Sequence, residues 1–381
     1  MRILGASYGN PHSTSTYSGV PFALFNELET QGKLVDRINI NMPCVSDVFR
    51  NYIDINRSLI SRRPKRNKYW RYLPKVIDTL SNRYELAATK KFPHDTVIQI
   101  GVGGLPHPSK FLFAHVEFSI LTASNLRGFS KTYGFSQSKD LYLQRAIEGE
   151  RRFMEQCDVI WTNSDWTHET FAHHQIPKEK FFIHPPVANI SDPGELERDW
   201  SKPNVLFIGK DWNRKGGPQL LEAFINLKRK INNLSLTIIG CEPKVPQEKD
   251  IKVCGYLDKN NKDDAQIIKS ELKKATLFCM PSEWESTGIV YMEAALFGLP
   301  SIMSLGQGRE KIFPPNFTFF LKDRSISELS FLLEALLQQK NTLRDAGRKA
   351  REYAVNNYTW KTLTEKISDR IKTAKVISKT V

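Results

Sequence analysis

Residues 276–305 read TLFCMPSEWESTGIVYMEAALFGLPSIMSL, and they contain a complete strand–helix–strand unit. The apolar runs LFCM and SIM predict strands, and IVYMEAALF between them predicts a helix that Ser286 or Thr287 can cap. Gly298 followed by Pro300 is a common signal for the end of a helix. A strand, a helix and a second strand in this order favour a parallel sheet, so the stretch predicts an α/β fold.

Strand-like runs alternate with helix-length segments along the rest of the chain. The strand-like runs are RILGAS, LVDRINI, TVIQIGV, FLFAHV, DVIWTNS and FFIHPPV in the first half, and NVLFIGK, LSLTIIG and IKVCGYL in the second, before the unit above. We expect further helices at about 20–30, 145–156, 217–230 and 264–274. This alternation predicts parallel sheets that are covered by helices in both halves.

The length of the chain favours two domains. At 381 residues it is larger than a single core usually supports, and a polar, proline-bearing segment interrupts the strand–helix pattern before the pattern restarts. We therefore predict an α/β domain at 1–187, a linker at 188–203, a second α/β domain at 204–356 and a C-terminal helix at 357–381. Ligands are expected at the carboxyl ends of the strands and in the cleft between the domains.

Composition excludes several classes of protein. The hydrophobic share of 40% and the charged share of 25% are typical of a soluble globular chain. No apolar run approaches the ~18 residues that cross a bilayer, and the start MRILGAS is a strand pattern rather than a signal peptide. The five cysteines are scattered without a CxxC spacing or a His/Cys cluster, so we expect no structural metal. These features predict a cytoplasmic protein.

The net charge of +14 is concentrated in one segment. Between Asn56 and Lys91 there are eleven Lys or Arg residues and two acidic ones. The centre of this basic patch interleaves cations with aromatic rings, in Arg62, Arg63, Lys65, Arg66, Lys68, Tyr69, Trp70 and Arg71. Such a pattern fits an anionic membrane surface, here the inner face, or a groove for an anionic glycan or nucleic acid, but a solvated basic surface without a partner has the same composition.

Two glutamates stand eight positions apart around the start of the helix at 289, at Glu285 and Glu293. Free amides and the positive end of the helix dipole attract phosphate at such a place. The two carboxylates could be up to about 12 Å apart, which suits a nucleoside diphosphate joined to a sugar. In this interpretation Glu293 binds ribose, Glu285 binds the sugar, and the amides of Gly288, Ile289 and Val290 bind the diphosphate. The alternative is a pair of glutamates without a ligand.

A second candidate phosphate site follows the strand NVLFIG, which ends at Gly209. Lys210 comes next, and Arg214 and Lys215 precede two glycines at the start of the next helix. Cations at a junction between a strand and a helix can meet phosphate oxygens, and glycine lets the backbone come close. The order of residues is not that of a Walker A loop. A basic loop without a ligand is the alternative.

The first strand also runs into a small-residue loop, SYGNPHSTSTYSGVP at 7–21. Ser18 and Gly19 at its end can offer an approachable backbone to a phosphate. The glycine fingerprint GxGxxG is absent, so a nicotinamide dinucleotide site has little support.

Taken together, these motifs resemble the family 4 glycosyltransferases of the GT-B fold. The resemblance is carried by FIGKDWNRKGG, LTIIG, VCGYL, CMPSEWESTGIVYMEAALFGLPSI and GQGRE, and more weakly by YSGVPFALFNEL, ERRFMEQCDVIWTNSDWTHETF and YTWKTLTEKI. It implies two facing Rossmann-like domains, of which the first binds the acceptor and the second binds the nucleotide sugar. It also implies a C-terminal helix that packs back on the first domain, and transfer of a sugar from a nucleotide donor. Transfer would retain the anomeric configuration and require no metal.

The resemblance also implies roles for individual residues. Lys215 and Lys210, which stands where the family usually has arginine, would neutralise the leaving diphosphate, and Glu285 would hold the donor sugar. Other donor contacts would come from Gly19, Ser18, Gly209, Gly288, Ile289, Val290, Glu293, Tyr256 and Glu310, and His115 would lie at the sugar. Tyr256, beside the nucleobase, could equally pack against its neighbours.

Three functions remain open at this point. The first is a retaining transferase that uses a UDP-, GDP- or ADP-sugar and a lipid-linked or envelope glycan acceptor, by front-face attack of the acceptor hydroxyl. The second has the same donor chemistry with a nucleic acid as acceptor. The third is a nucleotide-sugar or nucleic-acid binding module without catalysis.

Overall fold

The structure is a computed structural model, and it describes residues 1–40, 92–102, 111–117, 119, 141–246 and 248–380. The basic patch at 62–71 lies outside these ranges. The chain divides into two compact units, of which the first holds 1–161, 170–182 and 368–381 and the second holds 162–169 and 183–367. Residues 188–203, the expected linker, are therefore counted with the second unit.

The first unit is built on a six-stranded sheet with the order β2-β1-β3-β4-β5-β6. The strands are β1 (Ile3–Ser7), β2 (Leu34–Asn39), β3 (Thr96–Ile100), β4 (Phe111–His115), β5 (Val159–Thr162) and β6 (Phe181–Ile183). The helices are η1 (Thr16–Gly19), α1 (Val20–Thr30), α6 (Leu141–Gln156), α7 (Asp165–Ala172) and η3 (Lys178–Lys180). β1 pairs in parallel with β2 and with β3, so the chain crosses back between them.

The loop after β1 has an unusual backbone before α1 begins. Tyr17 and Ser18 have φ of 45° and 55°, and Gly19, the N-cap of α1, has φ of 87°. Left-handed conformations cost little at glycine and more at other residues. Tyr17 packs so closely on Gly101 that a Cβ there would lie 2.1 Å from the tyrosine hydroxyl. This contact joins the loop after β1 to the loop after β3, where the strand order reverses.

The second unit has a six-stranded sheet with the order β12-β11-β10-β7-β8-β9. The strands are β7 (Asn204–Ile208), β8 (Ser235–Ile239), β9 (Ile251–Val253), β10 (Leu277–Met280), β11 (Ser301–Ser304) and β12 (Thr318–Leu321). Every adjacent pair in this sheet is parallel. This is the Rossmann strand order, and its topological switch point lies between β7 and β10. A ligand is expected beyond the carboxyl ends of those two strands.

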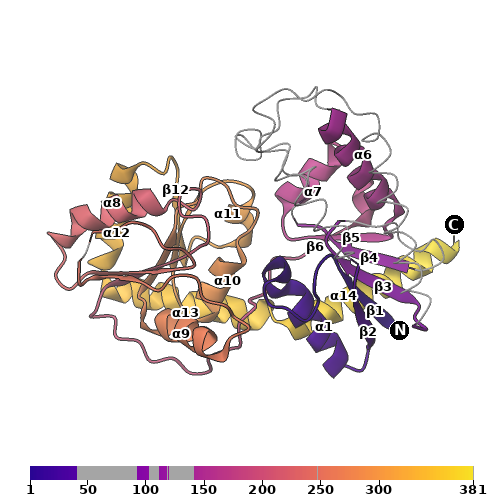
Figure 1. Ribbon diagram of the computed structural model, residues 1–381, viewed down its shortest axis with the longest axis horizontal. Coiled ribbons are helices and arrows are strands. Elements are labelled where there is room, and N and C mark those ends of the chain that lie inside the picture. Colours follow the sequence, from indigo (N-terminus) through magenta and orange to yellow (C-terminus); the bar gives the residue numbers. More distant parts are fainter. Residues whose placement is uncertain (41–91, 103–110, 118, 120–140, 247, 381) are drawn as a thin grey trace, which may run out of the picture. The chain divides into compact units, whose positions relative to one another are not determined.

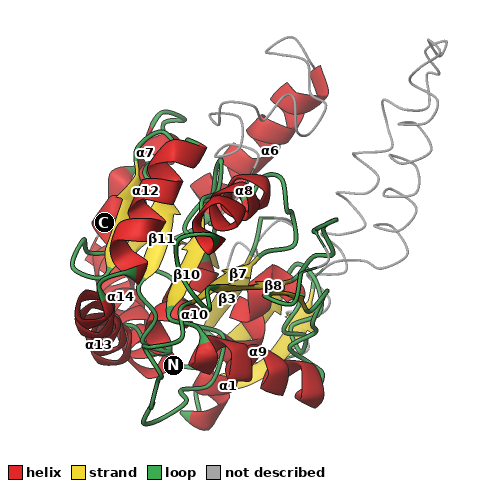
Figure 2. Ribbon diagram, turned by 90° about the vertical axis from the view of Figure 1, so that its left-hand side faces the viewer, coloured by secondary structure: helices red, strands yellow, loops and turns green. Residues whose placement is uncertain are grey.

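Helices enclose the second sheet (Figure 2). They are α8 (Gly217–Lys228), α9 (Lys262–Lys274), α10 (Ile289–Leu296), α11 (Arg309–Ile312), α12 (Ile326–Leu337) and α13 (Lys340–Asn357). In Figure 1, α8 and α12 lie on one side of the strands and α9, α10 and α13 on the other. The sheet and both helix layers share one apolar core, in which Phe207, Phe224, Phe278 and Leu333 are among the fully buried side chains.

The last helix, α14 (Trp360–Thr380), belongs to both units. Near its start, the Trp360 indole donates to the Ala188 carbonyl at 3.0 Å in the second unit. Near its end, Lys375 Nζ lies 2.5 Å from Asp95 Oδ1 in the first unit. The predicted fold class, two Rossmann-like α/β domains with a C-terminal helix that returns to the first, is confirmed. Within the described ranges, none of the helices combines the length and the apolar character that crossing a membrane requires.

Candidate active site

Two loops meet at the switch point of the second sheet, one after β7 and one after β10. The backbone amide of Glu283 in the second loop donates to the Arg214 carbonyl in the first at 2.8 Å. Gly216 has φ of 76°, and a Cβ at this position would lie 2.2 Å from the Pro281 carbonyl oxygen. Only glycine lets the two backbones approach this closely. The glycines after Lys215 therefore bring the two candidate phosphate-site loops together.

Lys215 and Glu285 form an ion pair across these loops. The two side chains are only 13% and 14% exposed, and Arg214 Nη1 lies 3.7 Å from the same carboxylate. Burial by itself would raise the pKa of the Glu285 carboxyl, but Lys215, Arg214 and Arg309 outweigh it, so that pKa lies below its ordinary value. Burial lowers the pKa of Lys215, and Glu285 partly offsets this effect. The site thus carries excess positive charge around one carboxylate.

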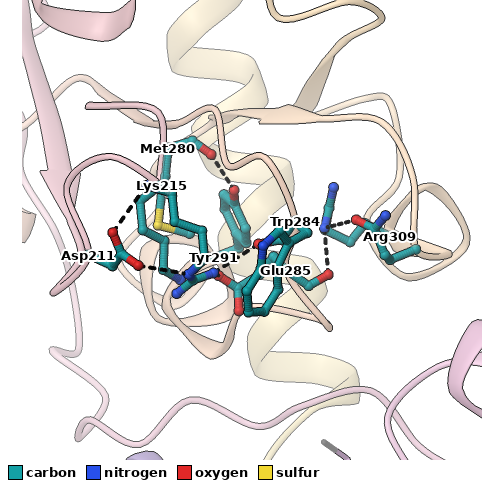
Figure 3. Close-up of polar contacts among 9 residues, drawn as sticks. Asp211, Lys215, Met280, Trp284, Glu285, Tyr291 and Arg309 are labelled. Carbon is teal, nitrogen blue, oxygen red and sulfur yellow. Dashed lines mark hydrogen bonds and ion pairs between the residues drawn. The ribbon is translucent and has the colours of Figure 1, made fainter. Parts of the chain in front are cut away.

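Arg309 also holds the loop that carries Glu285 (Figure 3). Its guanidinium is 1% exposed and donates to the Glu285 carbonyl at 2.7 Å and to the Ser304 carbonyl at 3.1 and 2.8 Å. A fourth hydrogen bond, of 2.9 Å, reaches the Gln307 side chain. The fork of N–H donors on arginine suits such a junction, because one side chain can tie two loops together. Arg309 fixes where Glu285 stands relative to β11.

Helix α10 begins at Ile289, as the sequence predicts, but its N-cap is Gly288 and not Ser286 or Thr287. Gly288 is left-handed, with φ of 71°, and no side chain caps the helix. A Cβ at Gly288 would lie 2.8 Å from the Tyr291 ring, so the close packing of this tyrosine selects glycine over a hydroxyl residue. The Tyr291 hydroxyl donates to the Met280 carbonyl at 2.5 Å (Figure 3) and anchors the helix to β10.

The start of α10 lies beside Glu285, since a Cβ at Gly288 would lie 3.1 Å from Cγ of that glutamate. The first amides of a helix have no partner inside it, and they carry the positive end of its dipole. Gly288, Ile289 and Val290 provide these amides directly after Glu285 in the chain. The structure therefore brings the predicted diphosphate amides and the Lys215–Glu285 pair together.

Glu293 is buried within α10, at 2% exposure, and it forms an ion pair with Lys259. Lys259 lies in the loop between β9 and α9, and its side chain is 25% exposed. We had not singled out this lysine in the sequence. The predicted ribose ligand thus has a cationic partner of its own.

The remaining predicted residues of this unit lie around these loops. Gly209 follows β7 and is buried, while Lys210 is exposed, with its ammonium 4.7 Å from the centre of the Tyr256 ring. Tyr256 is 51% exposed, so it does not pack into the core. Glu310 is exposed at the start of the short helix α11. Among the described residues, no group of three or more His, Cys, Asp or Glu side chains could hold a metal ion.

Three predicted residues belong to the first unit. Ser18 and Gly19 lie in the left-handed turn before α1 described above. His115 ends β4, is 4% exposed and packs on Trp161, with 3.9 Å between the ring centres. Ser18 and Gly19 thus follow the carboxyl end of β1, and His115 is at the carboxyl end of β4 in the same sheet.

Arg309 and Lys259 are the two charged residues of the site that sequence reasoning missed. Arg309 stands in the quoted motif GQGRE, where we chose the neighbouring Glu310. Lys259 comes two positions after VCGYL and looks like one of many surface lysines. Only Arg309 could have been found from the sequence, because an arginine that follows a glycine-rich turn and begins a short helix is well placed to bind carbonyls.

Part of the chain matches a known family. Residues 191–353 match the family model described as glycosyl transferases group 1. A curated relative is the GDP-mannose-dependent alpha-(1-6)-phosphatidylinositol monomannoside mannosyltransferase of Mycobacterium tuberculosis, which is 25% identical over 242 residues. That match covers 58% of this chain and 63% of the relative's length.

Solved structures with the same fold cover nearly all of the chain. Sucrose-phosphate synthase from Thermosynechococcus elongatus superposes with a TM-score of 0.67 at 14% identity, covering 99% of this chain and all of that one. WaaG, a glycosyltransferase involved in lipopolysaccharide biosynthesis, gives a TM-score of 0.64 at 16% identity over 97% of this chain and 99% of its own. The chain thus has the GT-B fold of these proteins, and its second unit contains a region that matches the group 1 glycosyl transferases.

Proposed function

We propose that this protein is a retaining, metal-independent glycosyltransferase of family 4. It moves a sugar from a nucleotide sugar to a hydroxyl of a lipid-linked or envelope glycan. The observation that carries the proposal is the buried Lys215–Glu285 pair, which stands at the carboxyl ends of β7 and β10 beside the open amides of α10. The match of 191–353 to group 1 glycosyl transferases supports it.

The cations and amides act on the leaving group. Breaking the bond between a sugar and phosphate builds negative charge on the departing diphosphate. Lys215 and Lys210 on the loop after β7, together with the first amides of α10, are fixed in place before the reaction and need little rearrangement to stabilise that charge. Removal of one such contact typically costs on the order of 10² to 10³ in rate.

The two glutamates bind the sugar rings at either end of the diphosphate. Glu293 accepts hydrogen bonds from the ribose hydroxyls, and Glu285 accepts them from the donor sugar. Lys215 already neutralises Glu285, which makes this carboxylate a poor nucleophile and favours a binding role. The acceptor oxygen then bonds to the anomeric carbon on the face from which the diphosphate leaves, and its proton passes to the departing phosphate oxygen.

The remaining predicted residues complete the donor site in this proposal. The family resemblance assigns Gly19 and Ser18 to the diphosphate, and His115 and Glu310 to the donor sugar. Tyr256 borders the nucleobase and keeps Lys210 at the mouth of the site. Each of these assignments rests on the family resemblance and on the positions described above.

The relative that uses GDP-mannose makes a GDP-sugar the first donor to test, and its phosphatidylinositol mannoside acceptor favours a lipid-linked glycan. The likeness to WaaG, which acts in lipopolysaccharide biosynthesis, points to the same class of acceptor. We assign the basic patch at 62–71 to docking on an anionic membrane that carries this acceptor.

The experiment is a thermal-shift screen against UDP-, GDP- and ADP-sugars, followed by product analysis. One donor should raise the melting temperature in proportion to its affinity and concentration. Nuclear magnetic resonance of the product should show a retained anomer, formed equally well in excess chelator. An inverted anomer, or a glycosyl adduct on Glu285 in mass spectrometry, would contradict the mechanism. Steep salt-dependent binding to duplex DNA without binding to anionic vesicles would instead indicate a nucleic-acid acceptor.

A further inference from the structure

We propose that Lys259 is a positioning residue for ribose recognition, which orients the buried Glu293 carboxylate toward the hydroxyls of a ribonucleotide donor. The proposal rests on the function proposed above and adds a residue to it. It assigns to this lysine the preference for a ribonucleotide over its deoxy counterpart.

The burial of the Glu293 carboxylate in α10 lowers the stability of the fold unless other interactions compensate it. Seven of the eight residues of this helix are buried, and Glu293 is the only charged one among them. A buried carboxylate loses its hydration, and a well-packed apolar residue in place of a buried ion pair is often as stable or more so. A stabilising role alone therefore explains the acid poorly, whereas a ligand that needs a fixed hydrogen-bond acceptor explains it well.

Lys259 reaches Glu293 from another element. The two residues are 34 positions apart in the chain, and Nζ of Lys259 donates to Oε1 of Glu293. The lysine side chain is 25% exposed, while Glu293 itself is 2% exposed. A ligand that reaches Glu293 therefore meets a carboxylate whose orientation one cation already sets.

The backbone that carries Lys259 is held by its own neighbours. The Asn260 amide donates to Asp258 Oδ1 at 2.9 Å, and the Asn261 amide donates to the Asp258 carbonyl at 2.9 Å. The Asp258 amide donates in turn to Asp264 Oδ2 on α9 at 2.8 Å. These bonds fix the turn on the start of α9, so the ammonium group approaches Glu293 from one direction.

The chemistry of a carboxylate gives this arrangement a specific readout. An ionised carboxylate can accept about four hydrogen bonds on its two oxygens, and Lys259 contacts only Oε1. Oε2 can accept from one hydroxyl of the ribose and the outer side of Oε1 from the other. A 2′-deoxy nucleotide lacks one of these donors, and hydrogen bonds to charged groups are worth about tenfold or more in affinity. If Lys259 turns the carboxylate toward both hydroxyls, its loss should lower this preference.

The test is isothermal titration of the full chain with GDP, UDP and ADP and with the 2′-deoxy form of whichever binds. The wild type should prefer the ribonucleotide by about tenfold or more. Lys259→Met and Glu293→Gln should each reduce the preference to about threefold or less, and the double variant should reduce it no further, because the two residues act as one unit. Lys262→Met, three positions along the chain, is the matched control and should keep the wild-type preference.

A preference in Lys259→Met equal to that of the wild type overturns the proposal, whether or not both affinities fall together, because the lysine then only neutralises charge. If Glu293→Gln loses the preference and Lys259→Met keeps it, the proposed function stands and this inference fails. A wild type that binds none of the three nucleotides removes both. Should Lys259→Met not fold, Lys259→Gln keeps an N–H donor for the carboxylate and should show an intermediate preference; an unchanged preference there also overturns the proposal.

Discussion

Replacement of Lys215 by methionine should separate what this residue does for stability from what it does for catalysis. Methionine has a similar length and no charge, so it fills the space and removes only the cation. Glu285 then keeps its burial, at 14% exposure, and loses its nearest partner. Two consequences follow, one for folding and one for transfer.

The effect on stability can be estimated from the contacts that remain. Removing one partner of a buried pair costs about 3 to 5 kcal/mol when nothing else compensates the charge. Here Arg214 stays 3.7 Å from the carboxylate and Arg309 still donates to the Glu285 carbonyl, so we expect a smaller cost, about 2 to 3 kcal/mol. The double variant Lys215→Met, Glu285→Gln leaves no orphan charge and should be within about 1 kcal/mol of the wild type.

The effect on transfer should differ from the effect on stability, because the second substitution does not restore the lost cation. The single variant loses a cation that faces the leaving group, so its turnover should fall on the order of 10²- to 10³-fold. The double variant should recover its stability and remain as inactive as the single one. Turnover is measured by mass spectrometry of the product, and stability by urea denaturation. Lys230→Met is the matched control: it also loses an ion pair, but at 60% exposure, and should change stability by less than about 1 kcal/mol and leave transfer intact. A double variant that transfers within about threefold of the wild type would refute the role of Lys215.

Three further perturbations test the site and its frame. Arg309→Lys keeps the charge but loses the fork that ties two loops, so turnover should fall about tenfold or more while donor affinity changes little, as steady-state kinetics would show. Gly216→Ala should lower the free energy of unfolding, measured with urea, by about 2 to 4 kcal/mol, because its φ is 76° and a Cβ would lie 2.2 Å from the Pro281 carbonyl oxygen. Gly32→Ala is the control: its φ of 65° is similar but its surroundings are open, so it should cost about 1 kcal/mol. Burial lowers the pKa of His184 to about 4, so below pH 6.5 the unfolded chain binds a proton that the native chain does not. The free energy of unfolding should therefore fall by up to about 1.4 kcal/mol per pH unit between pH 6.5 and 4. His184→Gln should reduce this dependence on pH. A wild-type slope in that variant would contradict the assignment.

The regular parts of the fold could be predicted from local sequence because they depend on local patterns. Strand-like runs marked every described strand except β12, which the sequence analysis did not predict. The glycine after Phe297 marked the end of α10, where Gly298 takes φ of 64°. The predicted N-cap of α10, Ser286 or Thr287, was wrong. It followed from the local sequence, since hydroxyl residues are better caps than glycine. The structure uses Gly288 instead because the Tyr291 ring occupies the space of a Cβ, and that contact depends on how α10 packs on β10.

The limits of prediction at the site have the same physical origin. Lys215 and Glu285 could be proposed separately, since each follows a strand and precedes a helix, and parallel strands place such loops on one edge. Which cation pairs with which carboxylate could not be proposed, because sequence distance carries no information on it: 70 residues separate Lys215 from Glu285, and 34 separate Lys259 from Glu293. The pairs depend on the tertiary fold. Lys215 and Glu285 follow the neighbouring strands β7 and β10, whereas Lys259 follows β9, the edge strand of the same sheet.

This strand order also explains why the two glutamates have different cations. Glu285 lies in the loop after β10, so it faces the loop after β7, the neighbouring strand, which carries Lys215. Glu293 lies a turn and more into α10 and faces the loop that returns from β9 to α9, which carries Lys259. A ligand that spans both carboxylates must therefore contact loops from three strands, with its charge at the switch point and its neutral hydroxyls toward the edge. A nucleotide sugar has this distribution of charge, whereas a free phosphate or a free sugar would satisfy only one of the two pairs.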